Sequence, residues 1–143
     1  VEARLPETYV SDPPSRIDLY RKLQRATDTA DIAALRKEME DRFGGLPSEA
    51  QNLLSETHLR LLAQRAGVRS VRLQENTLIY ETDQLKRTLT ILQASGQICR
   101  AVDDKTIYLR LGRVRNSGPS LLSFALDVFE RAFRNLASRG MEP

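Results

Sequence analysis

The sequence has 143 residues, of which 41% are hydrophobic and 29% are charged, a mixture typical of one soluble globular domain with its own hydrophobic core. No apolar run approaches the roughly 18 residues that cross a bilayer. The opening VEARLPETYV also lacks the apolar stretch of a signal peptide, so we expect a cytoplasmic protein. The net charge of +3, from 22 basic and 19 acidic residues, is too small to indicate a dedicated nucleic-acid domain.

The first 14 residues are predicted to form an extended lead-in, because Pro6 restricts Leu5 to extended conformations. A helix start follows, in which Asp12 can cap and proline suits the first helical position. Apolar residues at helical spacing then predict a first helix that ends near Ala26. These residues are Ile17, Tyr20 and Leu23.

Two further helices complete a helical part over residues 15–67. The second is expected to begin at Asp28 or Thr29 and to end at two glycines, residues 44–45. The third begins with a capping-box pattern of Ser48 and Gln51 and ends at Gly67. The core stripe of the second helix has a period near 3.6 residues and consists of Ile32, Leu35, Met39 and Phe43.

The apolar period changes from 3.6 to 2 after Gly67. Residues 71–73 and 77–81 predict one hairpin, and residues 98–102 and 107–111 predict another. Between them, Asp83 is expected to cap a helix whose apolar residues are Leu85, Leu89 and Leu92. A last helix, from about residue 117, has an apolar face so wide that it must cover a sheet or another helix. The predicted fold is α+β: N-terminal helices, then a small, mainly antiparallel sheet with covering helices over residues 68–139.

No pattern in the sequence predicts an enzyme. The motifs GxxxxGK[ST], GxSxG and HExxH are absent, and no GxGxxG motif occurs. The one histidine, His58, lies on the apolar stripe of the third helix, which favours a packed, hydrogen-bonded side chain over a catalytic base. Cys99 is the only cysteine, so we expect neither a disulfide within the chain nor a Cys/His zinc site. We therefore expect an interaction domain without catalytic residues, cofactor or metal, and an isolated chain that is monomeric.

Spaced motifs in the first 68 residues resemble one known family. Residues 5–10, LPETYV, resemble the family pattern LPEDYI/V, and residues 40–47, EDRFGGLP, match DRFG-x-LP. Arg16, Leu19, Tyr20 and Lys22 lie in the following helix, as in the family's R-x-x-x-Y-K/R pattern. Residues 52–54 and 59–63, with Arg65, Gly67 and Val68, match the next helix and its end. Together these motifs resemble the C-terminal TRCF domain of the bacterial transcription-repair coupling factor, a translocase that dislodges stalled RNA polymerase. Over residues 69–143 the resemblance extends only to the order of elements.

The resemblance implies that residues 1–143 form a single regulatory domain of a larger, ATP-dependent DNA translocase, without its motor. A longer parent protein also fits a chain whose first residue is Val1. In this family the domain packs against a UvrB-like N-terminal module and hides the surface that recruits UvrA, until the motor engages polymerase and DNA. The implied partner is that module, in indirect competition with UvrA, with no membrane and no direct nucleic-acid contact. Such a clamp lowers UvrA affinity only by the free energy of opening, about 1–3 kcal/mol for a typical coupling.

Glu38 and Asp41 are the candidate partner-binding residues. With the core stripe of the second helix facing inward, Glu38 lies sideways and Asp41 nearly opposite, so both can share an exposed ridge. The family resemblance implies that acids at these positions face basic residues of the UvrB-like module. The alternative is pairing within the helix, Glu38 with Arg42 and Asp41 with Lys37, and such exposed pairs contribute only about 0.3–0.5 kcal/mol.

The other signature residues are interpreted as structural. Phe43 is expected to fill the core, Gly44 to end the helix, and Arg42 to bond nearby carbonyl groups. The full set is Leu5, Pro6, Tyr9, Tyr20, Arg42, Phe43, Gly44, Leu46, Pro47 and Gly67.

A second hypothesis is a module that contacts nucleic acid or RNA polymerase through an arginine-rich strand edge. The arginines that would form it are Arg100, Arg110, Arg113 and Arg115. Phosphate contacts would make such binding fall steeply with salt. The sequence lacks the interleaved aromatic residues that stack on single strands, and a basic edge also discourages edge-to-edge aggregation.

Overall fold

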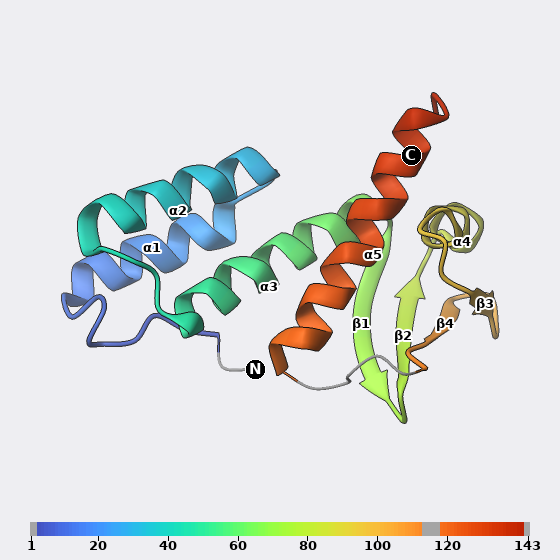
Figure 1. Cartoon of the computed structure of the whole chain (residues 1–143), viewed down its shortest axis with the longest axis horizontal. Coiled ribbons are helices and arrows are strands. Elements are labelled where there is room, and N and C mark those ends of the chain that lie inside the picture. Colours follow the sequence, from blue (N-terminus) through green and yellow to red (C-terminus); the bar gives the residue numbers. More distant parts are fainter. Residues whose placement is uncertain (1–2, 113–117, 142–143) are drawn as a thin grey trace. The chain divides into compact units, whose positions relative to one another are not determined.

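The computed structural model describes residues 3–112 and 118–141, in an order of elements that confirms the predicted α+β class (Figure 1). The chain divides into two compact units, residues 1–61 and 62–143. The boundary falls inside the third helix rather than at its end. The last turn of that helix is part of the second unit. There the Arg65 guanidinium lies 4.0 Å from the ring centroid of Phe133, a residue of the last helix.

Helix α1 (Pro13–Arg25) begins as predicted, with the Asp12 carboxylate accepting a hydrogen bond from the Ser15 N–H at 2.9 Å. Its buried face differs from the prediction. Leu19 and Leu23 are buried, whereas Ile17 is 53% exposed. Ile17 lies two residues, about 200°, away from Leu19 around the helix, so the two cannot share the core face.

The lead-in before α1 contains a turn and is not extended throughout, which corrects the prediction. The N–H groups of Tyr9 and Val10 both donate to the Pro6 carbonyl at 3.0 Å. The Arg16 guanidinium then donates to the carbonyls of Leu5, at 2.7 Å, and Val10, at 3.0 Å. Arg16 thereby holds the folded lead-in against the start of α1.

Helix α2 (Thr29–Phe43) is capped by Asp28, whose carboxylate accepts from the Asp31 N–H at 3.0 Å. Ile32, Leu35 and Met39 are buried as the stripe predicts. Phe43, in contrast, is only partly buried, because it ends the helix and packs at the rim of the core.

Helix α3 (Ser48–Arg65) lacks the predicted capping box. Ser48 already lies in the first turn, so its hydroxyl comes one residue too late to cap the Gln51 N–H. That N–H donates to the Pro47 carbonyl at 3.0 Å, and the Ser48 hydroxyl donates to Glu49 at 3.1 Å. The buried core of this unit comes from the lead-in and all three helices and comprises Leu5, Val10, Leu19, Leu23, Ala26, Ile32, Leu35, Met39, Ala50, Leu54 and Leu61.

The second unit contains a four-stranded antiparallel sheet of order β1-β2-β4-β3. The strands are β1 (Val68–Gln74), β2 (Thr77–Thr82), β3 (Cys99–Ala101) and β4 (Thr106–Arg110). Strands β1 and β2 form the first predicted hairpin, with Glu75 and Asn76 at positive φ in its turn. Alternation then places Leu78, Tyr80, Ile107 and Leu109 on one face, where all four are buried.

Helices α4 (Leu85–Ala94) and α5 (Gly118–Ser138) pack on that face and against each other. The Tyr80 and Phe129 rings meet edge to face, with centroids 5.9 Å apart. Asp83 does not cap α4 as predicted: it pairs with Arg69 at 3.2 Å, and the Thr82 hydroxyl accepts from the Gln84 N–H instead.

The buried face of α4 is also shifted from the prediction. Leu92 is buried as expected, but Leu85 and Leu89 are only half-buried. The other buried residues of α4 are Thr88, Ile91 and Ala94.

Two buried threonines join the end of α3 to the start of α4. The Thr82 hydroxyl donates to the Gly67 carbonyl at 2.7 Å, and the Thr88 hydroxyl donates to the Ala66 carbonyl at 2.8 Å. Gly67 has a φ of 81°, and a Cβ atom built there would lie 3.2 Å from the Thr88 hydroxyl oxygen. Gly67 is therefore required both by its backbone conformation and by the closeness of α4.

We predict that Gly67→Ala lowers the free energy of unfolding by about 2–3 kcal/mol, because the substitution adds crowding against a buried threonine to the roughly 1–2 kcal/mol of left-handed strain. Gly96→Ala is the matched control in the same unit, since Gly96 has a φ of 90° with no atom within 4 Å of an added Cβ. Urea denaturation of both variants measures the difference. Equal losses would show that the contact with Thr88 adds nothing.

Candidate protein-interaction site

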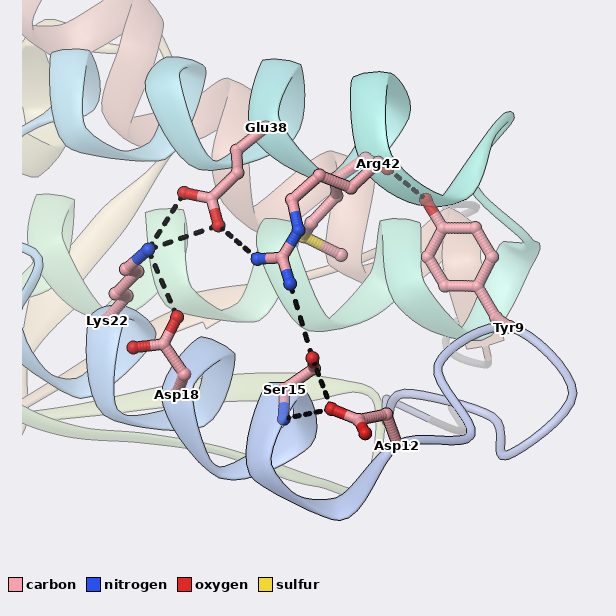
Figure 2. A network of polar contacts seen from close by, with 8 residues as sticks. Tyr9, Asp12, Ser15, Asp18, Lys22, Glu38 and Arg42 are labelled. Atoms are coloured by element: carbon pink, nitrogen blue, oxygen red, sulfur yellow. Dashed lines mark hydrogen bonds and ion pairs between the residues drawn. The ribbon is translucent and has the colours of Figure 1, made fainter.

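Glu38 on α2 lies between two basic side chains. Its carboxylate accepts hydrogen bonds from the Lys22 ammonium of α1, at 3.0 and 3.1 Å, and from the Arg42 guanidinium, at 2.8 Å (Figure 2). The sequence indicates the pair with Arg42, four residues later in the same helix, but not the pair with Lys22 from another helix. With 28% of its side chain exposed, Glu38 is part of the seam between α1 and α2.

The polar network extends from Glu38 to further residues of α1, through Lys22 and through Arg42 (Figure 2). Lys22 also pairs with Asp18 at 3.1 Å, one turn earlier in α1. Arg42 also donates to the Ser15 hydroxyl at 3.2 Å, and Ser15 in turn donates to the capping Asp12. The expectation that Arg42 bonds carbonyl groups is therefore wrong, since its hydrogen-bond partners are a carboxylate and a hydroxyl. The network ties α1, from its cap at Asp12 to Lys22, to the C-terminal half of α2.

These contacts also shift the titration of the paired groups. The hydrogen bond from Lys22 is the largest cause of a lowered pKa for Glu38; partial burial opposes the shift and the bond from Arg42 adds to it. The hydrogen bond to Glu38 likewise raises the pKa of Lys22, and Asp18 adds to that effect. Glu38 is thus held as an anion, with its charge largely satisfied within the unit.

Asp41 differs from Glu38 in its surroundings. It lies three residues later on α2 and is exposed. Within residues 3–112 and 118–141, Asp41 makes no hydrogen bond or ion pair, and the alternative pairing with Lys37 does not form. Of the two candidate acids, Asp41 is the one whose carboxylate remains free for a partner cation.

A shallow hollow of about 280 Å³ lies beside Glu38, between α1 and α2. Its rim carries charges of both signs, including Arg25, Asp31 and Glu38, and Leu35 contributes an apolar wall.

Several signature residues hold the lead-in and the end of α2 together. The Tyr9 hydroxyl lies 2.8 Å from the Gly44 carbonyl and 3.2 Å from the Met39 carbonyl. The Leu5 N–H donates to the Tyr20 hydroxyl at 2.9 Å. Gly44, with a φ of 88°, ends α2, and its N–H donates to Glu40. These contacts place the motif residues in the framework that positions the acids.

The rings and prolines of the signature have equally structural surroundings. The Phe43 ring lies 5.8 Å from the Tyr9 ring and 4.8 Å from the Arg42 guanidinium. Pro6 is buried, and Leu46 packs against the core as α3 begins. The carbonyl of Pro47 accepts the first backbone bond of α3.

The described residues contain no cluster of three or more His, Cys, Asp or Glu side chains that could hold a metal ion. No described helix combines the length and the apolar character needed to span a membrane. His58 is half-buried. Arg100 lies on β3 and Arg110 on β4, whereas Arg113 and Arg115 fall outside the described residues.

The sequence model of the TRCF domain matches residues 1–90, which is more than half of the chain. The chain belongs to the TRCF-domain family. This confirms the resemblance carried by the motifs of the first 68 residues. A crystal structure titled as the C-terminal domain of transcription-repair coupling factor matches 97% of this chain and 91% of that chain, with a TM-score of 0.79 and 19% identity. At that identity the likeness shows the fold.

Similar curated proteins are transcription-repair-coupling factors. The one from Escherichia coli (strain K12) is 27% identical over 135 residues, which is 91% of this chain. The one from Mycobacterium tuberculosis is 37% identical over 71 residues, 50% of this chain. The one from Haemophilus influenzae is 40% identical over 68 residues, 48% of this chain. The aligned regions span only 10%, 6% and 6% of these relatives.

We predict that Glu38→Gln lowers the free energy of unfolding at neutral pH by about 0.5–1 kcal/mol, as expected for loss of partly exposed ion pairs. Because the folded-state pKa of Glu38 is depressed below 4.5, this stabilisation is present above the unfolded pKa and is lost as pH falls through the folded pKa. The difference from wild type should therefore shrink as the pH falls below the ordinary glutamate pKa of about 4.3, and vanish once Glu38 is protonated in the folded state. Denaturation at several pH values measures it, with Asp41→Asn as a control expected to change little. A difference that persists in acid would mean that the charge of Glu38 is not what stabilises the seam.

Proposed function

We propose that this TRCF domain is a regulatory part of a transcription-repair coupling factor that packs on the UvrB-like module of the same parent protein. In that position it masks the UvrA-recruiting surface until the motor engages stalled RNA polymerase. The domain contributes no chemistry of its own, whereas the parent is a cytoplasmic, ATP-dependent DNA translocase. Family membership supports the general role, and the exposed acid Asp41 of α2 supports the contact.

The exposed and unpaired Asp41 is the observation that carries this proposal. A basic side chain of the partner can pair with it without breaking any contact inside the domain. An exposed acid that is already paired inside the fold must give up that ion pair to form a new one, so the net gain in binding free energy is small.

Glu38 acts differently in this proposal. Lys22 and Arg42 fix its carboxylate at the edge of the hollow between α1 and α2. Because Lys22 and Arg42 already neutralise this carboxylate, a partner cation in the hollow gains less from Glu38 than from Asp41, although the anion is ordered before binding. Glu38 is therefore both a member of the seam and a second contact for the partner.

Masking of the UvrA-recruiting surface requires only a modest free energy of closing. If the domain lowers UvrA affinity through a coupling of about 1–3 kcal/mol, opening it raises that affinity roughly 5–150-fold. A contact of a few ion pairs around α2 suits this range. It is strong enough to hold the closed state, and weak enough for the motor to release it.

We predict that Asp41→Lys in the parent protein increases UvrA affinity at least fivefold in the absence of DNA and polymerase. Like charges brought together across the interface destabilise the closed state. Titration of labelled UvrA measures the change.

The matched control is Glu56→Lys, which reverses an exposed acid of α3 that makes no hydrogen bond or ion pair with any described residue. The control should leave UvrA affinity at the wild-type value. Unchanged affinity in Asp41→Lys, with the domain still folded, would remove α2 from the masking surface. An equal increase in both variants would indicate a general charge effect.

A further inference from the structure

The face of the sheet opposite α4 and α5 carries an exposed groove of about 510 Å³. The strand register puts a cross-sheet row on this face: Arg72, Ile79, Tyr108 and Arg100, one from each strand. Arg110 lies two residues after Tyr108 on the same face of β4. Arg100 of β3 and Arg110 of β4 take no part in the polar network around Glu38, so this face is a separate surface.

The groove has an apolar floor and one apolar wall. Ile79 forms part of the floor and is only 3% exposed, although it lies on the face opposite α4 and α5. Ile98 lines the groove and is 90% exposed. No other large hydrophobic residue in the described part of the chain is as exposed. An apolar side chain so open to water, beside a half-buried tyrosine, is a typical anchor for a partner.

The groove is positive on the side of β3 and β4. Arg100 and Arg110 both line it and are exposed, and within the described residues neither forms an ion pair. The Arg100 guanidinium contacts only the Tyr108 ring, 6.0 Å from its centroid. Arg72, in contrast, has a carboxylate nearby, with Glu81 at 3.8 Å. Two guanidinium groups are thus available for anionic groups of a partner.

The spacing of these two arginines suits an extended peptide. They are diagonal neighbours across the β3–β4 pair, a position that separates Cα atoms by about 7–8 Å. Alternate residues of an extended strand lie about 6.6 Å apart on one side. Acidic residues at positions i and i+2 of a peptide can therefore reach both arginines, while a neighbouring apolar residue covers Ile98.

We propose that this sheet face binds an acidic segment of another protein, in extended conformation, with carboxylates on Arg100 and Arg110 and an apolar side chain against Ile98. Nucleic acid fits the groove less well. Stacking surfaces for single strands present several aromatic rings, and among the residues that line this groove only Tyr108 is aromatic. The exposed isoleucine also has no role in contacting phosphates, whereas it suits an apolar side chain.

Two-dimensional NMR of the 143-residue chain tests this proposal with a synthetic peptide, Ser-Asp-Thr-Asp-Thr-Leu-Ser. The expected result is saturable shifts of amide signals in β3 and β4. The Arg100→Gln/Arg110→Gln double variant should weaken binding about tenfold, roughly threefold for each arginine. Arg134→Gln, which removes an exposed arginine of α5, should leave binding unchanged. Ile98→Ser should also weaken binding, and a peptide with Asn in place of both Asp residues should not bind.

Three outcomes would overturn the proposal. One is the absence of saturable shifts on β3 and β4. Another is an equal loss in Arg134→Gln, which would indicate only general charge attraction. The third is displacement of the peptide by a single-stranded oligothymidine with higher affinity, which would assign the face to nucleic acid. None of these outcomes bears on UvrA masking, which is tested through α2.

Discussion

The structure of the N-terminal unit depends on one carboxylate that is shared by two cations. Glu38 receives Lys22 from α1 and Arg42 from its own helix, so a single anion fixes the register of α1 against α2. Arg42 then reaches Ser15, beside the capping Asp12, and thereby links the start of α1 to the end of α2. Asp41, three residues after Glu38, has no such partner among the described residues. The functional proposal follows from this division of roles between two acids three residues apart.

The order and type of the elements followed from the periods of the apolar residues, but the details of faces and caps did not. On α1, Leu19 and not Ile17 faces the core. Both residues are apolar, so the face is selected by how the lead-in and α2 pack on α1. Asp83 precedes α4 and has the right side chain to cap it, yet Arg69 on the neighbouring strand competes for it. In each case a contact distant in sequence decides between local options of similar energy.

The candidate site could be predicted only in part. Helical periodicity placed Glu38 and Asp41 away from the core stripe, and an i, i+4 rule indicated the Glu38–Arg42 pair. The pair with Lys22 spans 16 residues and depends on how α1 packs on α2, which no local pattern encodes. The sequence likewise indicated an arginine-rich strand edge that includes Arg100 and Arg110, but not the groove beside it. It took the strand register to bring Arg100 beside Tyr108 and Arg110 and to leave Ile98 exposed at the rim.

The central claim is that Asp41 contacts the partner directly, whereas Glu38 also stabilises the fold. Calorimetric titration of this chain with the separately produced UvrB-like module tests it most directly, with Asp41→Asn and Glu38→Gln measured alongside thermal melts. The account predicts that Asp41→Asn weakens binding about threefold or more, as expected for one ion pair, while the melting temperature stays at the wild-type value. Glu38→Gln should weaken binding and also lower the melting temperature. Wild-type affinity in Asp41→Asn would contradict the account, because α2 would then not be the surface that meets the module.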